Sequence, residues 1–159
     1  MQAGTTVING WALFGHPLFL NRLKSLIEEV ESLVDRDPSG FHHHPHYKFF
    51  EKVDTSVRER VPENPAAQGY VLGNTLGKDC RHWRRVKSGL PHRYRLFFQF
   101  RNDASRRIVY AWLNDETTLR KDGARTDVYA TFKALLRNGG MPKTFADLLD
   151  VSDPVFWRA

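Results

Sequence analysis

The part of this 159-residue chain best suited to chemistry is a run of cations between Lys78 and Arg107. The run holds ten Lys or Arg against two Asp, whereas the whole chain has a net charge of only +6, so the rest is slightly acidic. Arginine offers a planar fork of donors that fits phosphate oxygens, and lysine carries a compact charge on a group that can exchange a proton. The sequence therefore predicts phosphate binding or phosphate chemistry here. The ten cations are Lys78, Arg81, Arg84, Arg85, Lys87, Arg93, Arg95, Arg101, Arg106 and Arg107.

Strand-like sequence carries most of these cations. A period of two, typical of half-buried strands, extends over residues 83–87, 93–99 and 107–112. Turn-forming residues fill the gaps at 88–91 and 101–105. We therefore expect three consecutive antiparallel strands with one solvent-exposed, cationic face.

The remaining pattern predicts an α+β fold in a single domain spanning 1–159, in which two helices precede a small, mainly antiparallel sheet and a helix follows it. We expect the ends, 1–5 and 151–159, to be flexible, although 155–157 could also fold back onto the core. The other predicted elements are a first strand over 6–14, an amphipathic helix over 18–34, a second helix over 47–61, a loop over 66–80 anchored by Leu72 and Leu76, a helix opened by Asp127 and ended at Gly139, and a short helix over 144–149.

Composition narrows the class of protein. A single cysteine, Cys80, excludes an internal disulfide or a multi-cysteine zinc site and suits a reducing compartment. The sequence lacks a membrane-spanning apolar run and a signal-peptide pattern, so we expect a cytoplasmic protein. An isoelectric point near 9.7 favours a polyanionic partner, and cations on strands favour nucleic acid over a membrane surface.

Four histidines at positions 42–46 could suggest a metal site. Adjacent histidines cannot all face one ion on a regular element, and Pro45 interrupts the run. We therefore favour a solvated loop over a metal site. The residues concerned are His42, His43, His44 and His46.

Four stretches carry a resemblance to a known family: NGWALFGHPLF at 9–19, WRRVKSG at 83–89, RYRLFFQF at 93–100 and WLNDETTLRKDGARTDVYATFKALL at 112–136. They resemble the YhaV toxins of the RelE superfamily, which belong to bacterial type II toxin–antitoxin systems. The resemblance implies a RelE-like fold, with helices on one sheet face and an mRNA-cleaving surface on the other. It also implies a PrlF-type antitoxin whose AbrB-like domain brings the complex to operator DNA. The histidine run departs from the family pattern.

RNA can be cleaved without a metal because its own 2′-hydroxyl can act as the nucleophile, so we expect no cofactor. The protein must then remove a proton, stabilise charge on the phosphorane and protonate the leaving 5′-oxygen. Lys87 could share the base role because neighbouring cations disfavour its charged form. His82 or His92 would have to be recruited for a paired-histidine mechanism, which we favour less. The catalytic residues that the resemblance implies are Arg85, Lys87, Arg95, Tyr129 and either Arg120 or Arg125, and the predicted nucleic-acid-binding residues are Lys78, Arg81, Arg84, Arg93 and Arg107.

Other interpretations stay open at this point. The same cations could neutralise phosphates in a non-catalytic nucleic-acid-binding module that acts with an antitoxin as a co-repressor. A metal-dependent enzyme built on the histidine run is a third possibility. Individually, Arg85 or Arg95 could be solvated side chains, and Tyr129 a residue at the edge of the core. Trp83, Trp112 and Phe98 suit the core or base stacking better than chemistry.

Overall fold

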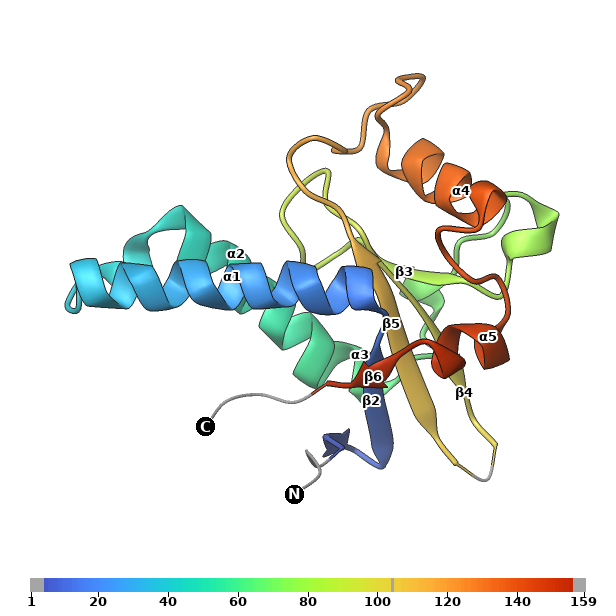
Figure 1. Cartoon of the computed structure of the whole chain (residues 1–159), viewed down its shortest axis with the longest axis horizontal. Helices are drawn as coiled ribbons and strands as arrows, with labels where there is room; N and C mark the ends of the chain where they lie inside the picture. Colours follow the sequence, from blue (N-terminus) through green and yellow to red (C-terminus); the bar gives the residue numbers. More distant parts are fainter. Residues whose placement is uncertain (1–4, 104, 156–159) are drawn as a thin grey trace.

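A mixed β-sheet forms the middle layer of the molecule, between two groups of helices (Figure 1). The computed structural model describes residues 5–103 and 105–155. Within this part the strands are β1 (Val7–Ile8), β2 (Trp11–Gly15), β3 (Arg84–Val86), β4 (Leu96–Arg101), β5 (Arg107–Leu113) and β6 (Asp153–Pro154). The α-helices are α1 (Pro17–Arg36), α2 (Pro45–Thr55), α3 (Val61–Glu63), α4 (Val128–Asn138) and α5 (Phe145–Asp150).

The predicted three-stranded meander is confirmed. β3 pairs with β4 and β4 with β5, all antiparallel, and Arg85 stands opposite Phe97 in the register. The sheet continues through β2, which pairs with β5 in parallel, so its order is β1-β2-β5-β4-β3, with β6 also on β2. The single first strand expected over 6–14 was wrong. Asn9 and Gly10 both have positive φ and make a tight turn that separates β1 from β2.

Helices cover both faces of the sheet, so the expected open cationic face was wrong. α1 and α2 pack on one face, where Phe19 and Val53 belong to the same buried cluster as Phe98. α4 and α5 pack on the other, where Phe132 stacks on Phe97 with ring centroids 4.1 Å apart. The physical reason is visible in β4: its run Leu96-Phe97-Phe98 places apolar side chains on both faces, as in a strand buried on two sides.

The histidine run starts a helix. His42 and His43 lie in a 3₁₀ turn (Phe41–His43), and the His44 ring accepts a hydrogen bond from the amide of His46 at the start of α2. The run is exposed, as expected, but it is not simply a loop, and the second helix begins at Pro45 rather than at Tyr47. Among the described residues, no three His, Cys, Asp or Glu side chains are grouped to hold a metal ion.

The connecting segments lie close to their predicted places. α2 continues through a π-turn (Ser56–Arg60) into α3, and two short 3₁₀ turns (Gln68–Tyr70 and Lys78–Cys80) interrupt the segment before β3. Leu72 and Leu76 are buried, as expected of anchors. Val155 folds back and is fully buried, whereas 156 and 157 lie outside the described residues, as do 1–4. In the described part of the chain, no helix combines the length and apolar character needed to cross a membrane.

Candidate functional site

The hydroxyl of Tyr129 is the point at which two of the predicted arginines meet. Its oxygen accepts a hydrogen bond from Nε of Arg85 at 3.1 Å and another from Nε of Arg95 at 3.0 Å. Arg85 comes from β3, Arg95 lies immediately before β4, and Tyr129 is in the first turn of α4. Three elements distant in sequence therefore converge on one oxygen atom.

Backbone carbonyls fix the two guanidinium groups in place. Nη1 of Arg85 donates to the carbonyl of Val71 at 2.8 Å, and Nη1 of Arg95 donates to the carbonyl of Tyr94 at 2.9 Å. Arg95 is only 5% exposed, whereas Arg85 is half-buried. A charged side chain this deeply buried is stable only when it is well hydrogen-bonded, and these contacts meet that requirement.

Arg120 completes the group from above the ring of Tyr129. Its guanidinium carbon lies 5.2 Å from the ring centroid, and its Nη1 is 2.7 Å from Oδ1 of Asp127. The other carboxylate oxygen of Asp127 caps α4 by accepting from the amides of Tyr129 and Ala130. One carboxylate thus positions both the arginine and the helix that carries the tyrosine. We call Arg85, Arg95, Arg120, Asp127 and Tyr129 the Tyr129 cluster.

Asp127 stays ionised in this arrangement. Burial raises the pKa of its carboxyl group, but hydrogen bonds from Arg120 and from the amides of Lys121 and Ala130 outweigh burial and hold the pKa below its ordinary value. Asp127 was predicted only as a helix cap. Its second role is the ion pair with Arg120. The sequence contained a signal for this role, because the capping carboxylate follows a cationic stretch at Arg120 and Lys121.

The Tyr129 cluster has more positive than negative charge. Three guanidinium groups face the buried carboxylate of Asp127 and the exposed carboxylate of Asp122, which lies 3.7 Å from Nη2 of Arg120, and the Arg120 side chain remains 33% exposed. An excess of partly desolvated positive charge favours an anion as the missing partner, and guanidinium groups match phosphate oxygens especially well. The arrangement can therefore bind a phosphate group and stabilise additional negative charge on it.

Two predicted catalytic residues are not in the cluster. Lys87 follows β3 directly and Arg125 precedes α4, and both are exposed. In the part of the chain that the structure describes, neither side chain forms a hydrogen bond or an ion pair. Of the candidate histidines, His92 is exposed before β4, and a ring nitrogen of His82 lies 2.7 Å from the carbonyl of Lys143.

The predicted nucleic-acid-binding residues do not form one patch. Arg93 contacts the Tyr129 cluster, because its Nε donates to the carbonyl of Arg120 at 2.9 Å. Arg84 points to the opposite sheet face, over Phe100, and donates to the carbonyl of Arg81. Lys78 and Arg81 are exposed at the 3₁₀ turn before β3, while Arg107 lies at the start of β5, beside Arg101.

The aromatic candidates for base stacking are mainly core residues. Trp83 and Phe98 are fully buried, so neither ring is available to a base. Trp112 is half-buried and stacks near Phe97 at 5.9 Å between ring centroids. Asn114 is also fully buried, and its side-chain oxygen accepts from the backbone amide of Arg95 at 2.8 Å. Asn114 therefore fixes the segment that carries Arg95.

The sequence matches a known protein family over most of its length. The profile of the YhaV toxin family, described as a toxin with endonuclease activity of a toxin–antitoxin system, matches residues 13–153. The chain belongs to this family.

Individual relatives support the same assignment. The chain is 36% identical over 142 residues to the ribonuclease toxin YhaV of Escherichia coli strain K12, covering 89% of this chain and 91% of the relative. The toxin YhaV of Escherichia coli O6:H1 shows the same identity and coverage. No solved structure matches the chain significantly.

Proposed function

We propose that this protein is the toxin of a type II toxin–antitoxin pair and cleaves mRNA by metal-independent attack of the RNA 2′-hydroxyl. Membership of the YhaV family supports an endonuclease, and the name of the K12 relative supports RNA as the substrate. The structural observation that supports the proposed cleavage chemistry is the convergence of Arg85 and Arg95 on the hydroxyl of Tyr129, with Arg120 over its ring.

Each member of the Tyr129 cluster has a distinct role in this proposal. Arg85 and Arg120, the more accessible arginines, bind the scissile phosphate and stabilise the charge that develops on the phosphorane. Arg95 is buried and acts by holding Tyr129 in position. The hydroxyl oxygen of Tyr129 is already an acceptor for two donors, so its own proton is directed away from them and can protonate the leaving 5′-oxygen.

Proton removal from the 2′-hydroxyl falls to an exposed group beside the cluster. Lys87 is the first candidate, because it follows the strand that carries Arg85, and its side chain is free to approach a substrate. Attack by the 2′-oxygen forms a new bond to phosphorus and breaks the bond to the 5′-oxygen. The products are a 2′,3′-cyclic phosphate and a free 5′-hydroxyl, and no metal ion takes part.

The proposal extends to partners and location. A toxin of this class requires a neutralising antitoxin, for which a PrlF-type protein with an AbrB-like DNA-binding domain is expected from the family resemblance. The antitoxin complex would bind operator DNA, and the free toxin would act on mRNA in the cytoplasm, with or without the ribosome.

The test is cleavage of RNA by toxin freed from antitoxin, in excess chelator, with and without ribosomes. We expect cleavage with 2′,3′-cyclic phosphate ends in at least one condition, and a loss of roughly a hundredfold or more in Arg85→Gln. Arg36→Gln is the matched control, because Arg36 is the exposed last residue of α1. This end of α1 extends away from the sheet (Figure 1). Full activity in folded Arg85→Gln would remove the Tyr129 cluster from the mechanism.

The same experiment separates the other interpretations. A non-catalytic binding module would leave RNA intact and lose affinity in proportion to the phosphate contacts removed. A metal-dependent nuclease would stop working in chelator and resume when a divalent cation is restored.

A further inference from the structure

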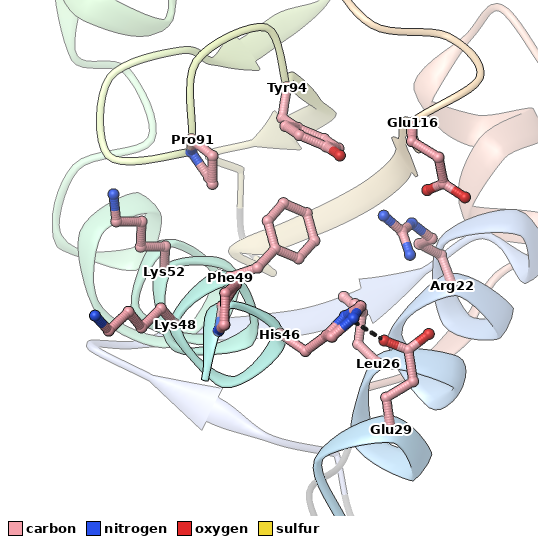
Figure 2. Close-up of a pocket in the computed structure, with 11 residues that line it drawn as sticks. Arg22, Leu26, Glu29, His46, Lys48, Phe49, Lys52, Pro91, Tyr94 and Glu116 are labelled. Atoms are coloured by element: carbon pink, nitrogen blue, oxygen red, sulfur yellow. Dashed lines mark ion pairs between the residues drawn. The ribbon is translucent and has the colours of Figure 1, made fainter. Parts of the chain in front are cut away.

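A concave surface lies on the side of the sheet that α1 and α2 cover. It is a groove of about 500 Å³ between α1, α2 and the turn that precedes β4, and we call it the α1–α2 groove (Figure 2). Apart from His46, which belongs to the histidine run, none of its lining residues was a candidate functional residue. They are Arg22, Leu26, Glu29, Pro45, His46, Lys48, Phe49, Lys52, Pro91, Tyr94 and Glu116.

Two aromatic rings form the centre of the groove. Phe49 from α2 and Tyr94 from the turn before β4 approach each other with ring centroids 4.7 Å apart and planes tilted by 57° (Figure 2). Both side chains are half-buried, so each still presents surface to the groove. Partly exposed rings of this kind are the platforms on which unpaired bases stack in proteins that bind single strands.

The charges around these rings are arranged asymmetrically. At one end, Arg22 lies beside Glu116 (Figure 2). Glu29 is paired with His46 at 3.1 Å. At the other end the positive charges of Lys48 and Lys52 are unbalanced, because neither side chain has an ion-pair partner among residues 5–103 and 105–155.

The two lysines are spaced to follow a phosphate backbone. They are four residues apart on α2, so they share a helix face with their Cβ atoms roughly 5–6 Å apart. That separation is comparable with the distance between successive phosphates of one strand. A cationic rim beside an aromatic centre combines the two elements of a single-strand binding surface.

Hydrogen bonds connect the groove to the Tyr129 cluster. Tyr94 lines the groove, and its carbonyl accepts a hydrogen bond from Nη1 of Arg95. Asn114 provides a second link: its side chain accepts from the amide of Arg95, and its carbonyl accepts from Nη2 of Arg22 at 3.3 Å. These bonds fix the position of the groove relative to the cluster, and half-buried Arg93 lies in the same segment before β4.

We propose that the α1–α2 groove binds single-stranded RNA adjacent to the cleaved bond, with a base stacked at Tyr94 and Phe49 and phosphates on Lys48 and Lys52. This inference rests on the proposed function. An acidic peptide segment is the competing occupant, but unpaired lysines spaced along one helix face beside stacking rings fit a nucleotide chain better.

Binding of an uncleavable probe tests the groove separately from the chemistry. A randomised single-stranded 2′-O-methyl oligoribonucleotide lacks the nucleophile, so its dissociation constant reports contacts alone. We expect the double variant Lys48→Glu/Lys52→Glu to bind it at least about tenfold more weakly, with a salt slope smaller by roughly 1.4, because two phosphate contacts are lost. Lys24→Glu is the matched control, since Lys24 is an exposed residue of α1 outside the groove.

The aromatic part is tested by a pair of substitutions at Tyr94. Tyr94→Ala should weaken binding by about five- to 150-fold, the range for loss of one stacked base. Tyr94→Phe keeps the ring and should bind as the wild type does. Circular dichroism and thermal unfolding show whether each variant is folded, and the exposed lysine variants remain informative if Tyr94→Ala is destabilised.

Other results of these binding experiments would overturn the groove proposal or the proposed function. Wild-type affinity in the lysine double variant and in folded Tyr94→Ala would overturn the proposal, as would a wild type that does not bind the probe. Normal RNA binding combined with loss of co-purifying antitoxin would identify the groove as a protein site instead. A wild type that binds the probe but cannot cleave natural RNA would overturn the proposed function and leave the groove as an RNA-binding surface.

Discussion

Removing a single oxygen atom by Tyr129→Phe should destabilise the protein measurably. The phenol oxygen accepts from Nε of Arg95, a residue only 5% exposed, and from Nε of half-buried Arg85. A hydrogen bond to a charged group contributes about 1.5–3 kcal/mol to stability. When the acceptor is removed and the donor stays buried, the protein loses most of this free energy. Water can replace the bond to Arg85, so the expected loss is about 2–3 kcal/mol, or roughly 5–10 °C in melting temperature for a chain of this length.

A double-mutant cycle tests whether this loss arises from the contact itself. Urea unfolding would be measured for wild type, Tyr129→Phe, Arg95→Met and the double variant. Because the two side chains are bonded directly, we expect a coupling energy of at least about 1 kcal/mol. Additivity within about 0.3–0.5 kcal/mol would refute the reasoning, since it would mean that the bond does not contribute to stability. Leu135→Ala controls for general weakening of the helix, because Leu135 is a half-buried α4 residue with an apolar side chain.

Two further predictions concern pH. The pKa of Asp127 is lowered in the folded state, so its ionised carboxylate stabilises the protein above the ordinary Asp pKa of about 3.9, and this stabilisation is lost as pH falls through the folded pKa. Asp127→Asn should therefore be less stable than wild type at neutral pH. Urea unfolding at several pH values should show the difference in stability shrinking in acid. Burial lowers the pKa of His16, whose neutral ring caps α1, so the stability of the protein should decrease as pH falls below about 6.5. The variant His16→Asn keeps a capping side chain that does not titrate, so it should not show this decrease. Thermal melts at pH 7.5 and pH 5 would contradict the His16 argument if both proteins lost equal stability.

Local sequence signals predicted much of the fold and much of the site. The meander followed from its period of two and its turns, and Asp127 followed from its place before an apolar helical stripe. Arg85, Arg95 and Tyr129 were candidates through their place in family motifs, and the structure joins them by hydrogen bonds. The roles assigned to them remain predictions.

What the sequence did not reveal depends on contacts between distant segments. The second helical layer was missed because regularly spaced cations near β3 and β4 suggested a solvated face, although consecutive apolar residues in β4 indicate burial on both sides. The parallel pairing of β2 with β5 joins residues about a hundred positions apart in the chain and has no local signature. The α1–α2 groove was missed for the same reason, since Phe49 and Tyr94 meet only after folding.

Asn114 links the groove to the Tyr129 cluster through hydrogen bonds. It is fully buried, and its side chain bonds the amide of Arg95 and the carbonyls of Arg93 and Thr118, while its own carbonyl accepts from Arg22. A buried amide with all of these bonds made is held rigidly, because breaking any one leaves a polar group unsatisfied. RNA in the groove would therefore contact a segment whose position is already fixed relative to Arg95. Such preorganisation is what charge stabilisation at a phosphate requires, since donors that must move during the reaction stabilise the transition state less.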